Sequence, residues 1–333
     1  MRPALLGFAA ALLAVPAASA PRPNSSGRIA VAVLGDSDSH SYHDRLADLG
    51  RGGSFAASTF NWIEIWARLR PHEIDPGPFA ASGGGRMIAA AKALFSVPTR
   101  VPRKEDYLYN YSWSGTRCAG LMTEWPEEAR NFIRRIKAEP ERWRDGLVVI
   151  RIGVNDFGQA DNLNRWASAP LDAAPIIDGC LAEIAHAAAA IRRVSDVHIA
   201  LIGIAHDYET PMAAAGVPDE TVQTVAAVLD RFDTGLVEIA AGDPRIAFVD
   251  DAAWLARRFG SRRSGGVAKT VEIAGMSLSN AVGDAPSNLH LADGHAGTIA
   301  SGLFLQHLVR ELNARFGWSL TPISDEDIVN LVR

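Results

Sequence analysis

The chain has 333 residues, of which 48% are hydrophobic and 21% are charged, a composition typical of globular proteins rather than disordered or fibrous ones. The net charge of −5 and the lack of a basic run argue against nucleic acid as the main partner. The two cysteines, Cys118 and Cys180, are too few for a disulfide scaffold or a cysteine-rich zinc module.

Residues 1–20 have the three parts of a secretory signal peptide. Arg2 supplies the positive charge, residues 4–15 form an apolar run too short to span a bilayer, and residues 18–20 give a small-residue cleavage pattern. We therefore expect a secreted or periplasmic protein with no integral membrane span after the leader is removed; an uncleaved anchor is the alternative. Export permits a disulfide between the two cysteines, and the sequence leaves two buried thiols equally open.

Short runs rich in β-branched residues predict parallel strands that are buried on both faces. They lie at residues 28–34, 147–152, 197–204 and 246–249, and a further run lies at 108–112. Amphipathic patterns between them predict helices at residues 175–194, 221–241 and 298–316. This alternation predicts an α/β fold with an open parallel sheet, covered by helices on both faces.

Two shorter helices are expected from their caps. Trp62 and Trp66 lie on an apolar stripe at helical spacing behind Thr59, which would serve as the N-cap. Ser324 and the acidic residues after it resemble a capping box and predict a last short helix.

No internal repeat or low-complexity linker divides the chain, so residues 21–333 are expected to form one domain. Residues 38–58 and 71–85 are loop-like and rich in Gly, Ser and Pro, and residues 260–289 are also irregular. Long loops inside a compact domain are usually functional or disordered.

Four short segments carry groups suited to chemistry, and sites in open α/β sheets form beyond the carboxyl ends of the strands. The segments are Gly35-Asp36-Ser37, Ser114-Gly115, Gly153-Val154-Asn155-Asp156 and Asp293-Gly294-His295. Together they contain a hydroxyl, a turn glycine, an amide, an imidazole and a carboxylate. Acyl transfer to a serine needs a base for the hydroxyl, a group that orients the base, and fixed donors for the oxyanion.

The ordered set of segments resembles the conserved blocks of the SGNH, or GDSL, hydrolase family. Residues 33–37 match the first block, residues 110–115 the second, residues 153–156 the third and residues 293–295 the fifth, in family order along the chain. The resemblance implies a three-layer α/β/α, flavodoxin-like fold with about five parallel strands. It also implies ester hydrolysis that needs no cofactor or metal.

The resemblance implies Ser37 as the nucleophile and His295 as the general base and then acid, with Asp293 orienting the imidazole. The family usually places this aspartate three residues before the histidine, a position that Ala292 occupies here. His290 is the alternative histidine, but His295 stands directly before the helix that follows the block.

The same resemblance implies an oxyanion hole made by the backbone N–H groups of Ser37 and Gly115 and the side-chain amide of Asn155. Asp36 and Asp156 would support these blocks through loop hydrogen bonds. The stretch between Ser37 and Gly115 is long for the family, which predicts an insertion at about residues 38–105 and a second one at about 260–289.

A cluster of possible metal ligands follows the first strand: Asp36, Asp38, His40, His43 and Asp44. Carboxylates and imidazoles ligate hard or borderline ions, so a metal site is one interpretation. The other is a solvated loop rim with one helix-capping aspartate. We favour the second, because the acyl-transfer groups are complete without a metal.

The sequence therefore predicts an exported serine esterase whose partner is a small-molecule or carbohydrate ester. A carbohydrate O-acetyl ester and a short-chain lipid or lysophospholipid ester are equally open. The polar loop after Ser37 and the lack of an evident apolar lid helix favour short acyl chains. A metal-dependent phosphoesterase and a non-catalytic binding module are the alternatives from other classes.

Overall fold

The structure is a computed structural model that describes residues 27–333 except residues 48, 159–161, 205–216 and 262–268. The expected leader, residues 1–20, lies outside the described residues. The assignment of residues 21–333 to one domain stays a prediction.

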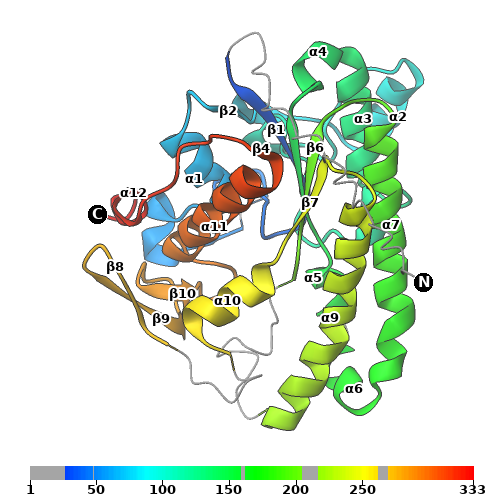
Figure 1. Ribbon diagram of the computed structural model, residues 1–333. Helices are drawn as coiled ribbons and strands as arrows, with labels where there is room; N and C mark the ends of the chain where they lie inside the picture. The colour runs from blue at the N-terminus through cyan, green and yellow to red at the C-terminus, as the bar shows by residue number, and fades with distance from the viewer. Residues whose placement is uncertain (1–26, 48, 159–161, 205–216, 262–268) are drawn as a thin grey trace, which may run out of the picture.

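A five-stranded sheet forms the centre of the molecule, and its strands are parallel (Figure 1). In spatial order they are β2 (Ile74–Asp75), β1 (Ile29–Gly35), β5 (Leu147–Arg151), β6 (His198–Ile202) and β7 (Ile246–Val249). The predicted α/β class and strand number are confirmed. The strand expected at residues 108–112 is wrong, because that segment forms only one bridge, between Val33 and Asn110. The fifth strand is β2, which has two residues and therefore no run to detect.

Alternation along β1 divides the core into two parts, one on each face of the sheet. Ala30, Ala32 and Leu34 pack with α3 (Glu128–Ala138), α7 (Ala174–Arg192) and α9 (Asp219–Ala241). Val31 and Val33 pack with α1 (Trp62–Leu69), α11 (Thr298–Phe316) and α12 (Asp325–Val329). Figure 1 shows α7 and α9 on one side of the sheet and α1 and α11 on the other, so the three-layer architecture is confirmed.

Of the two helix caps predicted from the sequence, the one near the C-terminus is confirmed and the one near the N-terminus is wrong. Helix α12 follows Ser324, whose hydroxyl accepts the backbone N–H of Asp327, as expected. Helix α1 is capped by Asn61 rather than Thr59. The Asn61 side chain accepts the N–H of Glu64 and the Glu64 carboxylate accepts the N–H of Asn61, which satisfies two donors at once.

Helix α7 and the turn before it, Pro170–Arg192, are long and apolar enough to cross a membrane by length and composition alone. The expectation that no later stretch would pass that test is therefore wrong. The helix buries Ile177, Cys180 and Ile184 in the core, and a core helix passes the same test. Cys180 forms a disulfide with Cys118, with 5.0 Å between their Cα atoms. Of the two states left open by the sequence, a disulfide or two buried thiols, the structure contains the disulfide.

Both expected insertions carry structure of their own. The first contains η1 (Gly53–Ser58), α1, β2, α2 (Arg86–Leu94) and a hairpin of β3 (Phe79–Ser82) with β4 (Lys104–Tyr107). The second contributes to a small sheet of β8 (Val271–Ile273), β9 (Met276–Val282) and β10 (Asn288–His290). The remaining short helices are η2 (Cys118–Leu121), α4 (Pro140–Trp143), α5 (Val154–Phe157), α6 (Asn162–Ser168), η4 (Pro170–Ala173) and α10 (Asp251–Phe259).

Candidate active site

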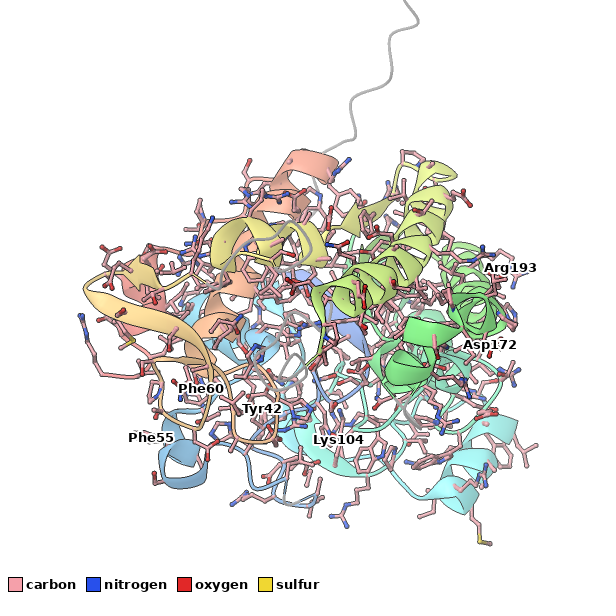
Figure 2. All side chains as sticks on the ribbon, turned by 90° about the horizontal axis from the view of Figure 1, so that it is seen from below. Tyr42, Phe55, Phe60, Lys104, Asp172 and Arg193 are labelled. Carbon is pink, nitrogen blue, oxygen red and sulfur yellow. A yellow bond between two sulfur atoms is a disulfide. The ribbon has the colours of Figure 1, made fainter. Side chains whose placement is uncertain are left out.

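The end of β1 lies against the end of β5, which brings two of the sequence blocks to one edge of the sheet. Gly35 stands opposite Arg151 in the parallel register, and a Cβ at Gly35 would collide with the Arg151 carbonyl oxygen. The Gly35 N–H donates to buried Glu128 at 2.7 Å. The glycine thus permits the close approach that places Ser37 and Asn155 at the same edge. The strands run downward in Figure 1, and Figure 2 looks onto the end where they finish.

Asp293 and His295 lie in one tight turn, which explains how a spacing of two residues brings them together. Gly294 between them has a φ of +87°, a left-handed conformation that favours glycine. The His295 N–H donates to Asp293 Oδ1 at 3.1 Å, and His295 Nδ1 lies 2.9 Å from Asp293 Oδ2. This second contact is close without being aligned as a hydrogen bond.

Arg51 joins this pair to the Ser37 turn. Its guanidinium donates to the Ser37 carbonyl at 3.0 Å, to Asp293 Oδ2 at 3.2 Å and to His295 Nε2 at 3.0 Å. It lies over the Tyr42 ring, 4.6 Å from the centroid, and its side chain is 3% exposed. Partial burial alone would raise the pKa of Asp293, but His295 and Arg51 together lower it well below its usual range.

Arg51 is not among the site residues predicted from the sequence. It stands in a glycine-rich stretch, Gly50-Arg51-Gly52-Gly53, which matches no block and whose contacts come entirely from tertiary folding. Because an arginine has no acceptor, His295 accepts this bond through Nε2 and carries its own proton on Nδ1. The nitrogen that would receive the serine proton therefore faces Arg51, and the Ser37 hydroxyl has no hydrogen-bond partner among the described residues.

The two further oxyanion candidates lie beside each other. Gly115 has a φ of +84° and a Cβ there would meet nothing, so the backbone conformation rather than space calls for glycine. The Asn155 amide donates to the Thr116 carbonyl at 3.0 Å, which fixes it against the Gly115 loop. The N–H of Trp113 donates to the Gly35 carbonyl at 3.0 Å, which ties this loop to the end of β1.

The two supporting aspartates each hold a loop. Asp36 Oδ1 accepts the N–H of Asp38 at 3.1 Å, and Asp156 Oδ2 accepts the N–H of Cys118 at 2.9 Å. Burial raises the pKa of both carboxyl groups, and for Asp36 the charge of Asp38 raises it further.

A buried arginine sets the charge next to the Ser37 turn. The Arg151 guanidinium lies 3.5 Å from Asp38, 3.4 Å from Asp251 and 4.5 Å from the centroid of the Phe304 ring. Burial would raise the pKa of Asp38, but Arg151, His295 and Arg51 outweigh it and lower the pKa. Burial raises the pKa of Asp251 to about 6 despite Arg151. A small pocket at this edge is lined by Asp36, Asp38, Arg151, Ile152, Val154, Gly203 and Ile204.

The loop after β1 is buried, so its interpretation as a solvated rim is wrong. The side chains of His40 and Asp44 have no exposed surface, and His40 Nε2 lies 2.8 Å from Asp44 Oδ2. His40 Nδ1 lies 2.9 Å from Ser114 Oγ and accepts the Ser114 N–H at 3.3 Å. Nδ1 is therefore the acceptor and Nε2–H the donor to Asp44. We call this chain of contacts the Ser114–His40–Asp44 relay.

The two histidines of the possible metal cluster make hydrogen bonds within the protein. His40 uses both nitrogens in the relay, and His43 Nδ1 lies 3.1 Å from Glu64. Among the described residues, possible ligand atoms of three residues lie within 4.8 Å of one another at Cys118, Asp156 and Cys180. The two sulfur atoms of this group form the disulfide.

The hairpin of β3 with β4 packs against this loop. Lys104 on β4 and Asp106 form a fully buried ion pair, with 2.8 Å between Nζ and Oδ2. Lys104 also donates to the Ser112 carbonyl, and Asp106 accepts the Ser41 N–H at 3.1 Å. Lys104, labelled in Figure 2, thus links the hairpin to the loop before Gly115. Burial lowers the pKa of this lysine, although Asp106 opposes the shift.

No family model and no curated protein match the chain, whereas solved structures do. An acetyl-xylooligosaccharide esterase from Geobacillus stearothermophilus is 13% identical, with 90% of this chain and 98% of that chain covered at a TM-score of 0.43. A phospholipase A1 from Streptomyces albidoflavus is 15% identical, with 85% and 99% covered at a TM-score of 0.44. The chain matches structures of SGNH/GDSL-type esterases over most of its length.

The aromatic residues next to the blocks differ in their surroundings. Phe157, which follows Asp156, is buried in the core against Phe232. Trp113 is half-buried, with its ring 4.8 Å from His40 and 6.5 Å from Trp125. His290 lies on β10.

Proposed function

We propose that the protein is an exported serine esterase that hydrolyses carboxylic esters through an acyl-enzyme. The observation that carries this proposal is the 2.9 Å contact between Asp293 and His295 Nδ1, joined through Arg51 to the turn that bears Ser37. An aspartate on Nδ1 leaves Nε2 as the nitrogen that takes a proton from a nucleophile.

In the proposed reaction, Nε2 of His295 takes the hydroxyl proton of Ser37 while Oγ bonds to the ester carbon. The resulting oxyanion receives the N–H groups of Ser37 and Gly115 and the Asn155 amide. The leaving alkoxide departs with the proton from the imidazolium. Water activated by His295 then splits the acyl-enzyme and restores the serine. Substrate binding must release Nε2 from Arg51 before the first proton transfer, because one lone pair cannot serve both groups.

Two ester classes are candidates for the substrate. The polar loop at the Ser37 turn, with Arg51, Asp38 and Arg151, favours a small polar ester such as a carbohydrate O-acetyl ester. Helix α2 is the specific observation that favours the second candidate, an acyl ester of a lipid, because it exposes large apolar side chains.

A chain-length series separates these classes. Rates with p-nitrophenyl acetate, butyrate, octanoate and palmitate are measured beside acetate release from acetylated xylan. A steep fall from acetate to octanoate together with release from xylan supports the carbohydrate ester, and a preference for the long chains supports the lipid ester.

The nucleophile is tested by serine-directed phosphonylation followed by peptide mass spectrometry. An adduct on Ser37 with parallel loss of activity is expected. Hydrolysis that resists the phosphonate and stops with a chelator would instead indicate the metal-dependent alternative.

A further inference from the structure

Helix α2 turns its large apolar side chains to the solvent. Met87 is 88% exposed, Ile88 55%, Leu94 84% and Phe95 80%, and the helix contains no buried residue. At 100° per residue Met87, Ile88 and Leu94 fall on one side of the helix, and Phe95 follows directly as its C-cap. We call this side the outer face of α2.

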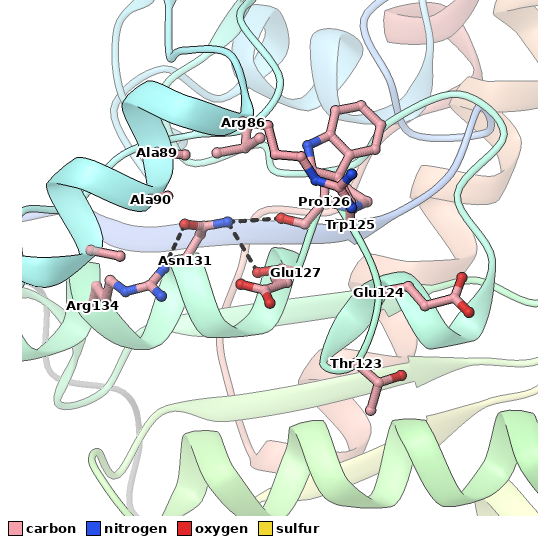
Figure 3. A pocket seen from close by; sticks show the side chains of 12 residues that line it. Arg86, Ala89, Ala90, Thr123, Glu124, Trp125, Pro126, Glu127, Asn131 and Arg134 are labelled. Atoms are coloured by element: carbon pink, nitrogen blue, oxygen red, sulfur yellow. Dashed lines mark hydrogen bonds between the residues drawn. The ribbon is translucent and has the colours of Figure 1, made fainter.

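The side of α2 that faces the protein carries mainly alanines. Arg86, Ala89, Ala90 and Ala93 line a groove of about 510 Å³ between α2 and α3 (Figure 3). The groove is closed on the other side by residues that include Trp125, which is 39% exposed. A surface helix normally turns its large apolar residues inward. The reverse arrangement in α2 leaves a contiguous apolar surface, which marks an interaction site.

The chain segment that carries the outer face has side-chain charges of one sign. Residues 76–104 contain no Asp or Glu, and Lys92 and Arg103 of this segment reach the surface, whereas Arg86 lines the groove. The whole chain has a net charge of −5, so this segment is a basic island on an acidic protein. Two acidic residues, Glu124 and Glu127, lie across the groove behind the helix.

We propose that the outer face of α2 is a docking surface for an anionic lipid membrane. Apolar side chains flanked by Lys and Arg are the features of helices that lie in a membrane interface. The apolar residues would enter the boundary between headgroups and acyl chains, and the basic residues would meet anionic headgroups. Exposed Val97, whose N–H donates to the Lys92 carbonyl, lies just beyond the C-terminal end of the helix.

The single sign of the charge distinguishes this partner from a second copy of the chain. A copy would bring its own basic island against this one at a symmetric interface, where like charges oppose association. An anionic bilayer has no such penalty. The inference goes beyond the proposed hydrolysis and does not depend on it, because docking requires no reaction at Ser37.

A fluorescence experiment on the full chain tests the docking directly. Leu94→Cys is labelled with the environment-sensitive dye NBD, and the only native cysteines are paired in the disulfide. Leu171→Cys, in η4, is the matched control because Leu171 is 87% exposed and Leu94 is 84% exposed. The label reports burial of its own position, so binding through the N-terminal apolar run alone leaves it unchanged.

With vesicles of equimolar phosphatidylcholine and phosphatidylglycerol, we expect a blue shift and a rise in NBD emission at position 94 and neither at 171. Raising the ionic strength from about 0.1 M to about 1 M shortens the Debye length from about 10 Å to about 3 Å and should weaken the response. Lys92→Gln with Arg103→Gln should raise the lipid concentration at half-response by roughly an order of magnitude, given two basic contacts.

Three outcomes overturn the proposal. An unchanged emission at position 94 shows that the outer face does not enter the bilayer. An equal change in NBD emission with vesicles of pure phosphatidylcholine shows that the basic residues do not contribute to binding through anionic headgroups. A blue shift that grows with protein concentration in the absence of vesicles identifies a second copy of the chain as the partner. Each outcome is read without any esterase activity, so it stands apart from a failure of the proposed reaction.

Discussion

Two regions of the molecule place a serine, a histidine and an aspartate near one another. In the relay, His40 makes hydrogen bonds on both nitrogens, to Ser114 and Asp44, and neither His40 nor Asp44 has exposed side-chain surface. In the candidate active site, the Asp293 side chain is 42% exposed, and its contact with His295 Nδ1 lacks the alignment of a hydrogen bond. The relay also runs in the opposite sense, since Nδ1 rather than Nε2 faces the serine.

The difference follows from what each region must do. A buried polar group has to find its partners within the protein, so complete hydrogen bonding accompanies burial. A catalytic imidazole has to exchange a proton with a substrate, so it needs access and a nitrogen that can change partner. The complete hydrogen bonding of the relay suits it to support the Ser114-Gly115 loop, in keeping with our proposal that Ser37 is the nucleophile.

Exchanging each serine for alanine gives the largest expected contrast. Ser37→Ala should lower turnover by about a millionfold, the cost of losing a triad nucleophile. Ser114→Ala should lower it by no more than about tenfold, because it removes one hydrogen bond worth about 0.5–1.5 kcal/mol. Turnover of p-nitrophenyl acetate is the measurement. A larger loss at Ser114 than at Ser37 would reverse the two assignments.

Removing the charge of the candidate triad acid should have the next largest effect. Asp293→Asn should lower turnover by about 10⁴-fold, because the imidazole loses its orienting charge and can adopt the wrong tautomer. His295→Ala, assayed beside it at about pH 8, should abolish nearly all activity. A loss below about tenfold for Asp293→Asn would leave a Ser–His dyad, with the proposed nucleophile retained.

Asn155→Ala should affect turnover more than the Michaelis constant. The amide would meet the oxyanion chiefly in the transition state, and losing one such donor costs roughly a hundredfold or more. Steady-state kinetics with p-nitrophenyl acetate separate the two parameters. A change confined to the Michaelis constant would make Asn155 a residue that positions the substrate.

The features that could be predicted from the sequence are those with a local signature. A parallel strand covered on both faces is an uninterrupted apolar run, which located β1, β5, β6 and β7. Strand β2 has two residues and lies at the sheet edge, so it carries no such run. The order of the blocks around Ser37 and His295 located the candidate site through a family resemblance.

The features that escaped the sequence analysis depend on contacts between distant segments. Arg51 meets Asp293 and His295 across more than 240 positions of the chain. The burial of His40 depends on the hairpin that carries Lys104, and the sequence of the loop that contains His40 gives no sign of this burial. For α2, periodicity can locate an apolar stripe, but only the packing tells which side faces the protein.

The relay should matter more for stability than for chemistry. Asp44→Asn keeps an oxygen for the backbone N–H of Leu46 but loses an acceptor for His40. An unsatisfied buried donor costs about 1–3 kcal/mol, so the free energy of unfolding in urea should fall by about that amount. Turnover per folded molecule should change little. A stable variant with strongly reduced turnover would instead make the relay part of the catalytic machinery.

The relay and the candidate active site should affect the free energy of unfolding in different pH ranges. Burial, followed by the charge of Lys104, lowers the pKa of His40. The unfolded chain therefore takes up a proton below about pH 6.5 that the folded chain refuses, and stability falls as the pH drops through that value. The lowered pKa of Asp293 acts later: its contribution is present above about pH 4 and is lost below it.

Urea unfolding between about pH 7.5 and about pH 5 measures this difference, with a slope of at most about 1.4 kcal/mol per pH unit from a single group. His40→Gln should have a shallower slope than the parent chain in this window, because it cannot be protonated in the unfolded state. Asp293→Asn should keep the parental slope there and differ only at lower pH. Equal slopes for His40→Gln and the parent would mean that His40 is protonated in the folded protein, which would contradict the role of Nδ1 as an acceptor and the neutral relay.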